Sequence, residues 1–161
     1  MAELTPYARL EAALGGVEPP FAVVDLDALR ANAADLARRA GGKPVRVASK
    51  SLRSRAVLRE ALRAPGFRGL MTFTLRESLW LHADGFADLL LGYPTVDGPA
   101  LAQLAALEDP APPVLMIDST EQLDLVDAAA PPGGRPQPVR VCLDFDTSLA
   151  SSASAARSAV G

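Results

Sequence analysis

The segment Lys43–Ser54 carries the residues of this sequence that are best suited to chemistry. A strand predicted at Val45–Ser49 places Val47 on one face and Arg46 and Lys50 on the other, because side chains alternate along a strand. A lysine at the carboxyl end of a parallel strand lies where α/β enzymes place their chemistry. When it is desolvated there, its amine can attack a carbonyl carbon and form a Schiff base. Lys50 is therefore the candidate catalytic residue, and a solvated surface lysine is the alternative.

The composition restricts the classes of protein to which this chain can belong. Its 161 residues suffice for one domain with a substantial core, which must consist mostly of Ala, Leu and Val because aromatic residues make up only 5%. A net charge of −3, with acidic and basic residues interspersed, argues against a nucleic-acid partner. One cysteine and one histidine argue against a metal site. The charged N-terminus and the absence of a long apolar run predict a cytoplasmic protein without a membrane partner.

The chain repeats a strand-then-helix pattern along most of its length. A helix at Leu4–Leu14 and a strand at Phe21–Leu26 come first, and Asp27 is expected to cap the helix that follows. Thr74 with Glu77, and Ser119 with Gln122, are expected to cap two later helices. Helices separate the remaining predicted strands, which are Val45–Ser49, Gly69–Phe73, Ala87–Leu91, Val114–Ile117 and Val139–Leu143.

Strands that alternate with helices predict an α/β fold with a parallel sheet, either open and doubly wound or closed into a barrel. No GxGxxG or Walker A sequence follows the first strand, so an open nucleotide-binding sheet lacks its usual support. We expect three regions: an N-terminal helix and strand at 1–26, the repeated units at 27–146, and a disordered Ala/Ser-rich tail at 147–161.

Four segments, in order, resemble one enzyme family: PFAVVDLDALRANAADLARRAG, VRVASKSLRS, FRGLMTFTLRESLWL and FADLLLGYPTV. They are similar to the fold-type III enzymes that use pyridoxal 5′-phosphate (PLP), whose common part is the alanine racemase N-terminal domain. The branch most resembled contains D-threonine aldolases, D-serine dehydratases and related deaminase/aldolases. The resemblance implies a partial (β/α)8 TIM barrel that starts at Val45–Ser49, with about five of the eight strands. Phe21–Leu26 would belong to a C-terminal β-domain that is absent.

The resemblance also implies the roles of three residues. Lys50 would hold PLP as a Schiff base. The enzyme would act on a D-amino acid as a lyase, with a racemase as the alternative. Arg46 would help to hold the charge of the cofactor or form a structural ion pair, and Tyr93 would line the cofactor pocket or pack a loop. The aldolase branch usually reads RPHxK at the lysine, whereas this chain reads RVASK and has no histidine there.

The resemblance further implies that full-length relatives are homodimeric. The loss of the family pattern after Asp146 predicts a chain truncated by a frameshift or an early stop, with little activity alone. Two other functions stay open: a non-catalytic PLP-binding protein that handles cofactor homeostasis, and an open-sheet binding module without a cofactor.

Overall fold

Parallel strands form the centre of the molecule in the computed structural model, which describes residues 5–147. One sheet has the order β1-β2-β3 and a second pairs β4 with β5, and every pair is parallel. A parallel bridge between Leu90 and Val114 joins the two sheets, so the strands follow chain order. Among the described residues, β1 and β5 form no ladder with each other. The arrangement is that of an open, partial (β/α)8 barrel, as the sequence predicted. The strands are β1 (Val45–Ala48), β2 (Phe67–Thr72), β3 (Leu89–Leu91), β4 (Leu115–Ile117) and β5 (Val141–Leu143).

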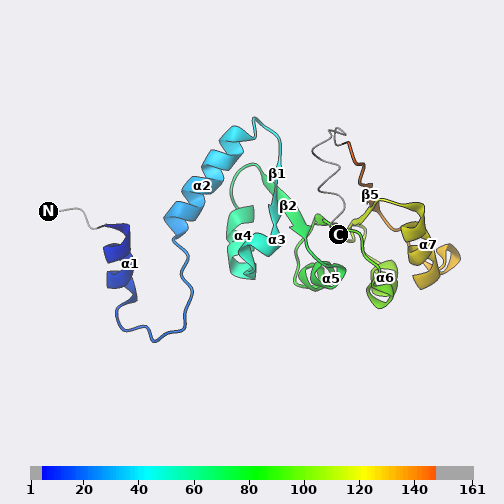
Figure 1. The fold of residues 1–161 in the computed structure, drawn as a ribbon, viewed down its shortest axis with the longest axis horizontal. Helices are drawn as coiled ribbons and strands as arrows, with labels where there is room; N and C mark the ends of the chain where they lie inside the picture. Colours follow the sequence, from blue (N-terminus) through cyan, green and yellow to red (C-terminus); the bar gives the residue numbers. More distant parts are fainter. Residues whose placement is uncertain (1–4, 148–161) are drawn as a thin grey trace, which may run out of the picture.

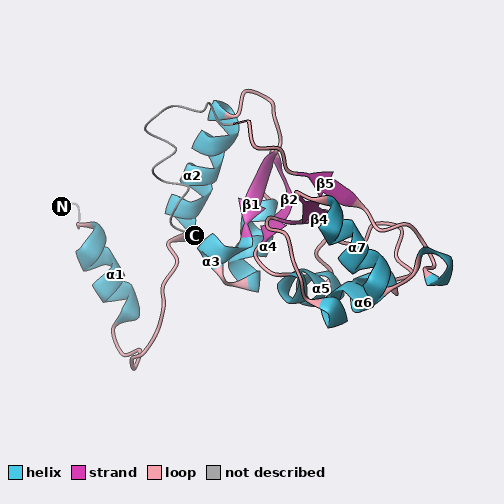
Figure 2. Ribbon diagram, turned by 45° about the vertical axis from the view of Figure 1, so that its right-hand side comes forward, coloured by secondary structure: helices cyan, strands magenta, loops and turns pink. Residues whose placement is uncertain are grey.

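Helices cover one face of these strands. Figure 2 shows α4 to α7 along the same side of the sheet, with α4 packed on β1 and β2, α5 on β2 and β3, and α7 on β4. Helix α1 lies apart at the N-terminal end of the molecule and has no buried residue (Figure 1). The helices are α1 (Pro6–Leu14), α2 (Leu26–Arg39), α3 (Ser49–Leu52), α4 (Arg55–Leu62), α5 (Leu75–Ala83), α6 (Gly98–Ala105) and α7 (Thr120–Ala129), with a 3₁₀ turn at Pro132–Gly134.

The core lies between the strands and the helices and is built mainly of leucine and alanine. Its first cluster contains Val47, Leu58, Ala61, Leu70, Leu81, Phe86 and Leu89, and its second contains Leu75, Leu79, Leu91, Ala100, Leu101, Leu104, Leu115 and Val126. The other face of the strands carries a second row of apolar residues, which are only half-buried. They are Ala48, Met71, Leu90, Met116 and Cys142. This inner face is the one that a closed barrel would enclose.

Some details of the predicted elements are wrong. Residues 21–25 form no strand, because the described chain offers them no neighbouring strand to pair with, and Leu26 already begins α2. Asp25, rather than Asp27, caps this helix and accepts hydrogen bonds from the N–H groups of Asp27 and Ala28, both at 3.0 Å. Strand β1 ends at Ala48, one residue earlier than predicted. Of the predicted tail, residues 148–161 lie outside the described part of the chain.

The predicted capping box of α5 is present. The Thr74 hydroxyl accepts a hydrogen bond from the Glu77 N–H at 3.1 Å, and the Glu77 carboxylate accepts one from the Phe73 N–H at 2.8 Å. Ser119, at the equivalent position before α7, makes no such capping bond, contrary to prediction. The Gln122 side chain does form its half of the predicted cap, since it accepts the Asp118 N–H at 2.9 Å as Glu77 accepts the Phe73 N–H.

This difference predicts unequal effects of removing the two hydroxyls. Thr74→Ala is expected to lower the free energy of unfolding by about 1 kcal/mol, because an N–H at the start of α5 loses its acceptor. Ser119→Ala is the matched control and should change the free energy much less. Urea unfolding followed by circular dichroism measures both, and equal losses would contradict the assignment of the cap to Thr74.

Candidate functional site

Three side chains from the carboxyl ends of consecutive strands meet at one place. Lys50 follows β1, Phe73 follows β2 and Tyr93 follows β3. The Lys50 Nζ donates a hydrogen bond to the Tyr93 hydroxyl at 2.9 Å and lies 5.2 Å from the centre of that ring. It also lies 5.5 Å from the centre of the Phe73 ring, which meets Tyr93 edge-to-face. The chain therefore brings an amine and two aromatic rings together where barrel enzymes place their sites.

The turn after β1 directs Lys50 toward these rings. Because α3 begins at Ser49, Lys50 lies in the first turn of a helix instead of continuing the alternation of the strand. Arg53 ends this helix in the left-handed conformation, with φ of 48°, and its N–H donates a hydrogen bond to the Ser49 carbonyl at 2.9 Å. Lys50 is exposed, contrary to the expectation that it is desolvated, because the inner face of the strands is open.

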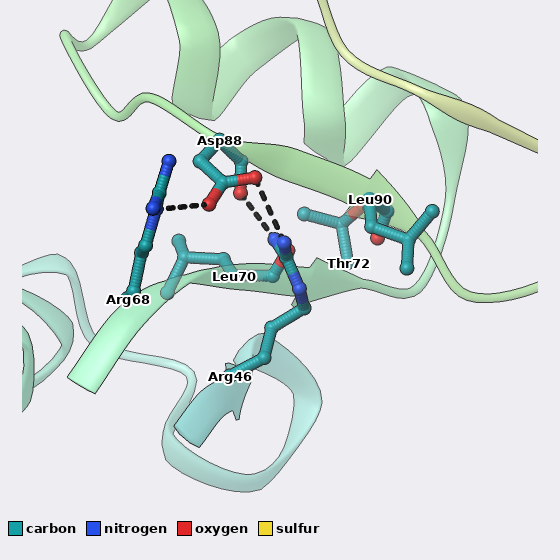
Figure 3. Close-up of polar contacts among 6 residues, drawn as sticks. All are labelled: Arg46, Arg68, Leu70, Thr72, Asp88 and Leu90. Carbon is teal, nitrogen blue, oxygen red and sulfur yellow. Dashed lines mark hydrogen bonds and ion pairs between the residues drawn. The ribbon is translucent and has the colours of Figure 1, made fainter. Parts of the chain in front are cut away.

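Arg46 belongs to a different cluster, at the opposite ends of the strands. Its Nη2 contacts the Asp88 carboxylate at 2.8 Å, and its Nη1 donates to the carbonyls of Asp88 at 2.5 Å and Leu70 at 3.2 Å (Figure 3). Arg68 reaches the other carboxylate oxygen at 3.3 Å. Asp88 lies just before β3 and Tyr93 just after it, so the structure does not bring Arg46 together with Tyr93. It gives Arg46 the structural ion pair that the sequence left open, and its contact with the cofactor remains a prediction.

A glycine lets Arg46 cross β2. Between Val45 paired with Phe67 and Val47 paired with Leu70, β2 carries one extra residue, which makes a β-bulge. Gly69 lies in this bulge with φ of +70°, and a Cβ atom there would lie 2.5 Å from the Arg46 Nη1. The guanidinium and the Asp88 carbonyl oxygen therefore occupy space that the side chain of any other residue type at this position would fill.

The ion pair makes the stability of the chain depend on pH. The hydrogen bond from Arg46 holds the pKa of Asp88 below its ordinary value of 3.8, against an opposing contribution from burial, and the charges of Arg46 and Arg68 add to the lowering. A carboxyl whose pKa is lowered by folding stabilises the fold above its unfolded pKa, and this stabilisation is lost as the pH falls through the folded value.

Asp88→Asn is therefore expected to lower the free energy of unfolding at neutral pH and to flatten its fall below about pH 4. Urea unfolding at several pH values between about 7 and 3 measures the effect. Asp97→Asn is a useful comparison. The hydrogen bond from Arg76 also lowers the pKa of Asp97, but this pair does not lie on the inner face of the strands. An acid limb for Asp88→Asn as steep as that of the unmodified chain would contradict the assignment.

Two further features of residues 5–147 bear on the kind of site. In this range no group of three or more His, Cys, Asp or Glu side chains is arranged to hold a metal ion. None of the helices there has the length and apolar character needed to cross a bilayer.

Comparison with known proteins assigns the family. The model of the alanine racemase N-terminal domain matches residues 24–151. The chain belongs to this family. Membership implies PLP as the cofactor, in agreement with the sequence, and the match includes all three strand ends of the site. No curated protein matches the chain.

Two solved structures share the fold of this chain. A D-threo-3-hydroxyaspartate dehydratase (H351A mutant) is 25% identical with a TM-score of 0.69, and the match covers 86% of this chain and 36% of that one. The D-threonine aldolase from Filomicrobium marinum is 22% identical with a TM-score of 0.66, covering 81% of this chain and 35% of that one. The chain thus spans about a third of the length of these enzymes.

Sequence reasoning missed Phe73 as a site residue. The signal was present, because Phe73 stands at the end of a predicted strand, as Lys50 does. The strand register, which aligns the three strand ends, cannot be inferred from the sequence.

Proposed function

We propose that this chain is the N-terminal part of a PLP-dependent enzyme that acts on D-amino acids, as an aldolase or a deaminating dehydratase, with Lys50 as the residue that bonds to the cofactor. The observation that carries the proposal is the position of the Lys50 Nζ, hydrogen-bonded to Tyr93 at the carboxyl ends of the strands. Two solved relatives that act on D-amino acids by their names, a dehydratase and an aldolase, support the reaction class.

The residues around Lys50 fit the chemistry of this cofactor. PLP supplies an aldehyde that condenses with an amine, releasing one water, and an aromatic ring that delocalises charge from the Cα of an amino acid. Phe73 and Tyr93 offer aromatic surfaces for a flat ring beside the Nζ. An amine must be unprotonated to attack a carbonyl carbon. The lysine therefore needs a neighbour that can form a hydrogen bond with both the charged and the neutral amine.

Tyr93 is such a neighbour. Its hydroxyl accepts a hydrogen bond from the charged Lys50 Nζ, and a phenol can also donate one to a neutral amine. The same contact therefore orients the nitrogen before and after it loses its proton. Phe73 borders a second side of the nitrogen, since its ring centre lies 5.5 Å away.

The test is a titration of the purified 161-residue chain with PLP. We expect a visible absorbance band that borohydride bleaches and converts into a permanent label on the Lys50 peptide. Adding D-threonine or D-serine to the loaded chain should shift the band more than the L-enantiomers do. A label without any response to amino acids would favour a non-catalytic PLP carrier, and a folded chain without a band would favour a binding module that has no cofactor.

A further inference from the structure

A second cation borders the ring that Lys50 contacts. The guanidinium carbon of Arg53 lies 6.0 Å from the centre of the Phe73 ring, and the Lys50 Nζ lies 5.5 Å from the same point. The Nε of Arg53 donates to the Lys50 carbonyl at 3.3 Å, which ties the guanidinium to the residue that carries the amine. Two positive charges therefore border one aromatic ring, close enough for one small molecule to meet both.

Neither of these cations is neutralised by the described protein. Within residues 5–147, every arginine except Arg53 and Arg140 forms an ion pair with an Asp or Glu, and Lys50 forms none. The chain has more acidic than basic residues, so two neighbouring cationic side chains that lack a carboxylate partner are unusual in it. In the same range neither Nη atom of Arg53 has a hydrogen-bond partner, which leaves the outer edge of the guanidinium free.

The backbone at Arg53 adds an independent observation. Its φ of 48° is a left-handed conformation that glycine adopts with less strain, and α3 ends there after only four residues. Strained non-glycine residues cluster at functional sites, so the side chain of Arg53 is a candidate for a function. Here the strained turn is also the one that places the guanidinium over the Phe73 ring.

We propose that Arg53 is the anion-binding residue of the Lys50 site, where its free Nη atoms hold a carboxylate or phosphate group of the molecule that reacts at Lys50. The proposal rests on the proposed function and deepens it. Arginine suits this role because its planar fork donates two parallel hydrogen bonds to an oxyanion. The anion has two sources, the phosphate of the cofactor and the carboxylate of the amino acid, and the experiment distinguishes them.

The experiment compares the 161-residue chain with Arg53→Gln, Arg53→Lys and the control Arg140→Gln, which removes the other arginine of residues 5–147 that lacks an ion pair. Dissociation constants for PLP and for pyridoxal, which has no phosphate, are measured from the absorbance band. If the anion is phosphate, Arg53→Gln weakens PLP binding about tenfold or more and leaves pyridoxal unchanged. Arg53→Lys should fall between the two, and Arg140→Gln should match the unmodified chain.

The carboxylate arm uses the chain loaded with PLP. If the anion is carboxylate, Arg53→Gln raises the concentration of D-alanine that shifts the band by about tenfold or more and leaves that of ethylamine unchanged. Arg53→Gly guards against misfolding, because it relieves the left-handed turn and removes the same guanidinium. Unchanged constants for PLP and D-alanine in both variants would overturn the proposal.

A final arm separates this inference from the proposed function. If the unmodified chain gives no band with either aldehyde, the proposed function fails, and Arg53 is tested with inorganic phosphate alone. Phosphate should then raise the melting temperature of the unmodified chain and not that of Arg53→Gln. Equal responses of the two chains would overturn the anion site as well.

Discussion

Lys50→Ala is expected to abolish the visible band that PLP forms with this chain. The reason is that Lys50 supplies the amine at the carboxyl ends of the strands, held by Tyr93 at 2.9 Å. The variant should fold normally, since Lys50 is exposed and its hydrogen bond is at the surface. Absorbance and circular dichroism on the same sample measure both expectations.

The sequence offers a matched control for this experiment. Lys43 is the other lysine of the chain, and it lies exposed before the amino end of β1, away from the aromatic rings. Lys43→Ala should keep the band unchanged. Peptide mapping after borohydride reduction distinguishes Lys50 from Lys43 and from the N-terminal amine. A band that survives in Lys50→Ala and disappears in Lys43→Ala would reject the site described here.

Gly69→Ala is expected to lower the free energy of unfolding by about 3 kcal/mol, the largest loss among the substitutions considered. Two costs combine at this position. The left-handed φ of +70° strains any residue with a Cβ. That Cβ would also press against the backbone carbonyl oxygen of Asp88 and lie 2.5 Å from the Arg46 Nη1, where the ion pair with Asp88 crosses β2. Urea unfolding measures the loss.

Gly85→Ala separates the two costs. Gly85 has a similar φ of +86°, but nothing lies within 4 Å of the position of its Cβ. It should lose about 1 kcal/mol from backbone strain alone. The difference between the two variants then measures the close contact of a Cβ at position 69 with the Asp88 carbonyl oxygen and the Arg46 guanidinium. Only the part that is due to the guanidinium should disappear when Arg46 is also replaced by Ala. Equal losses for Gly69→Ala and Gly85→Ala would show that the Asp88 carbonyl and the Arg46 guanidinium move away from the added Cβ without a cost in free energy.

The helices and strands were predictable because their signals are local. Turn residues and apolar periodicity lie within a few positions of the element they specify, as at Thr74 and Glu77, where the cap forms as predicted. The failures follow the same principle. Residues 21–25 have the composition of a strand, but a strand exists only when a neighbour accepts its hydrogen bonds.

The sequence by itself determined the parallel α/β order, the family and Lys50 as the candidate lysine, since each depends on short segments read in order. Only the tertiary structure decided what this lysine meets. Tyr93 is 43 residues away from it, and Asp88 is 42 residues away from Arg46. Contacts over such separations depend on strand register, here set by a bulge at Gly69, and no local pattern in the chain specifies which strand ends align.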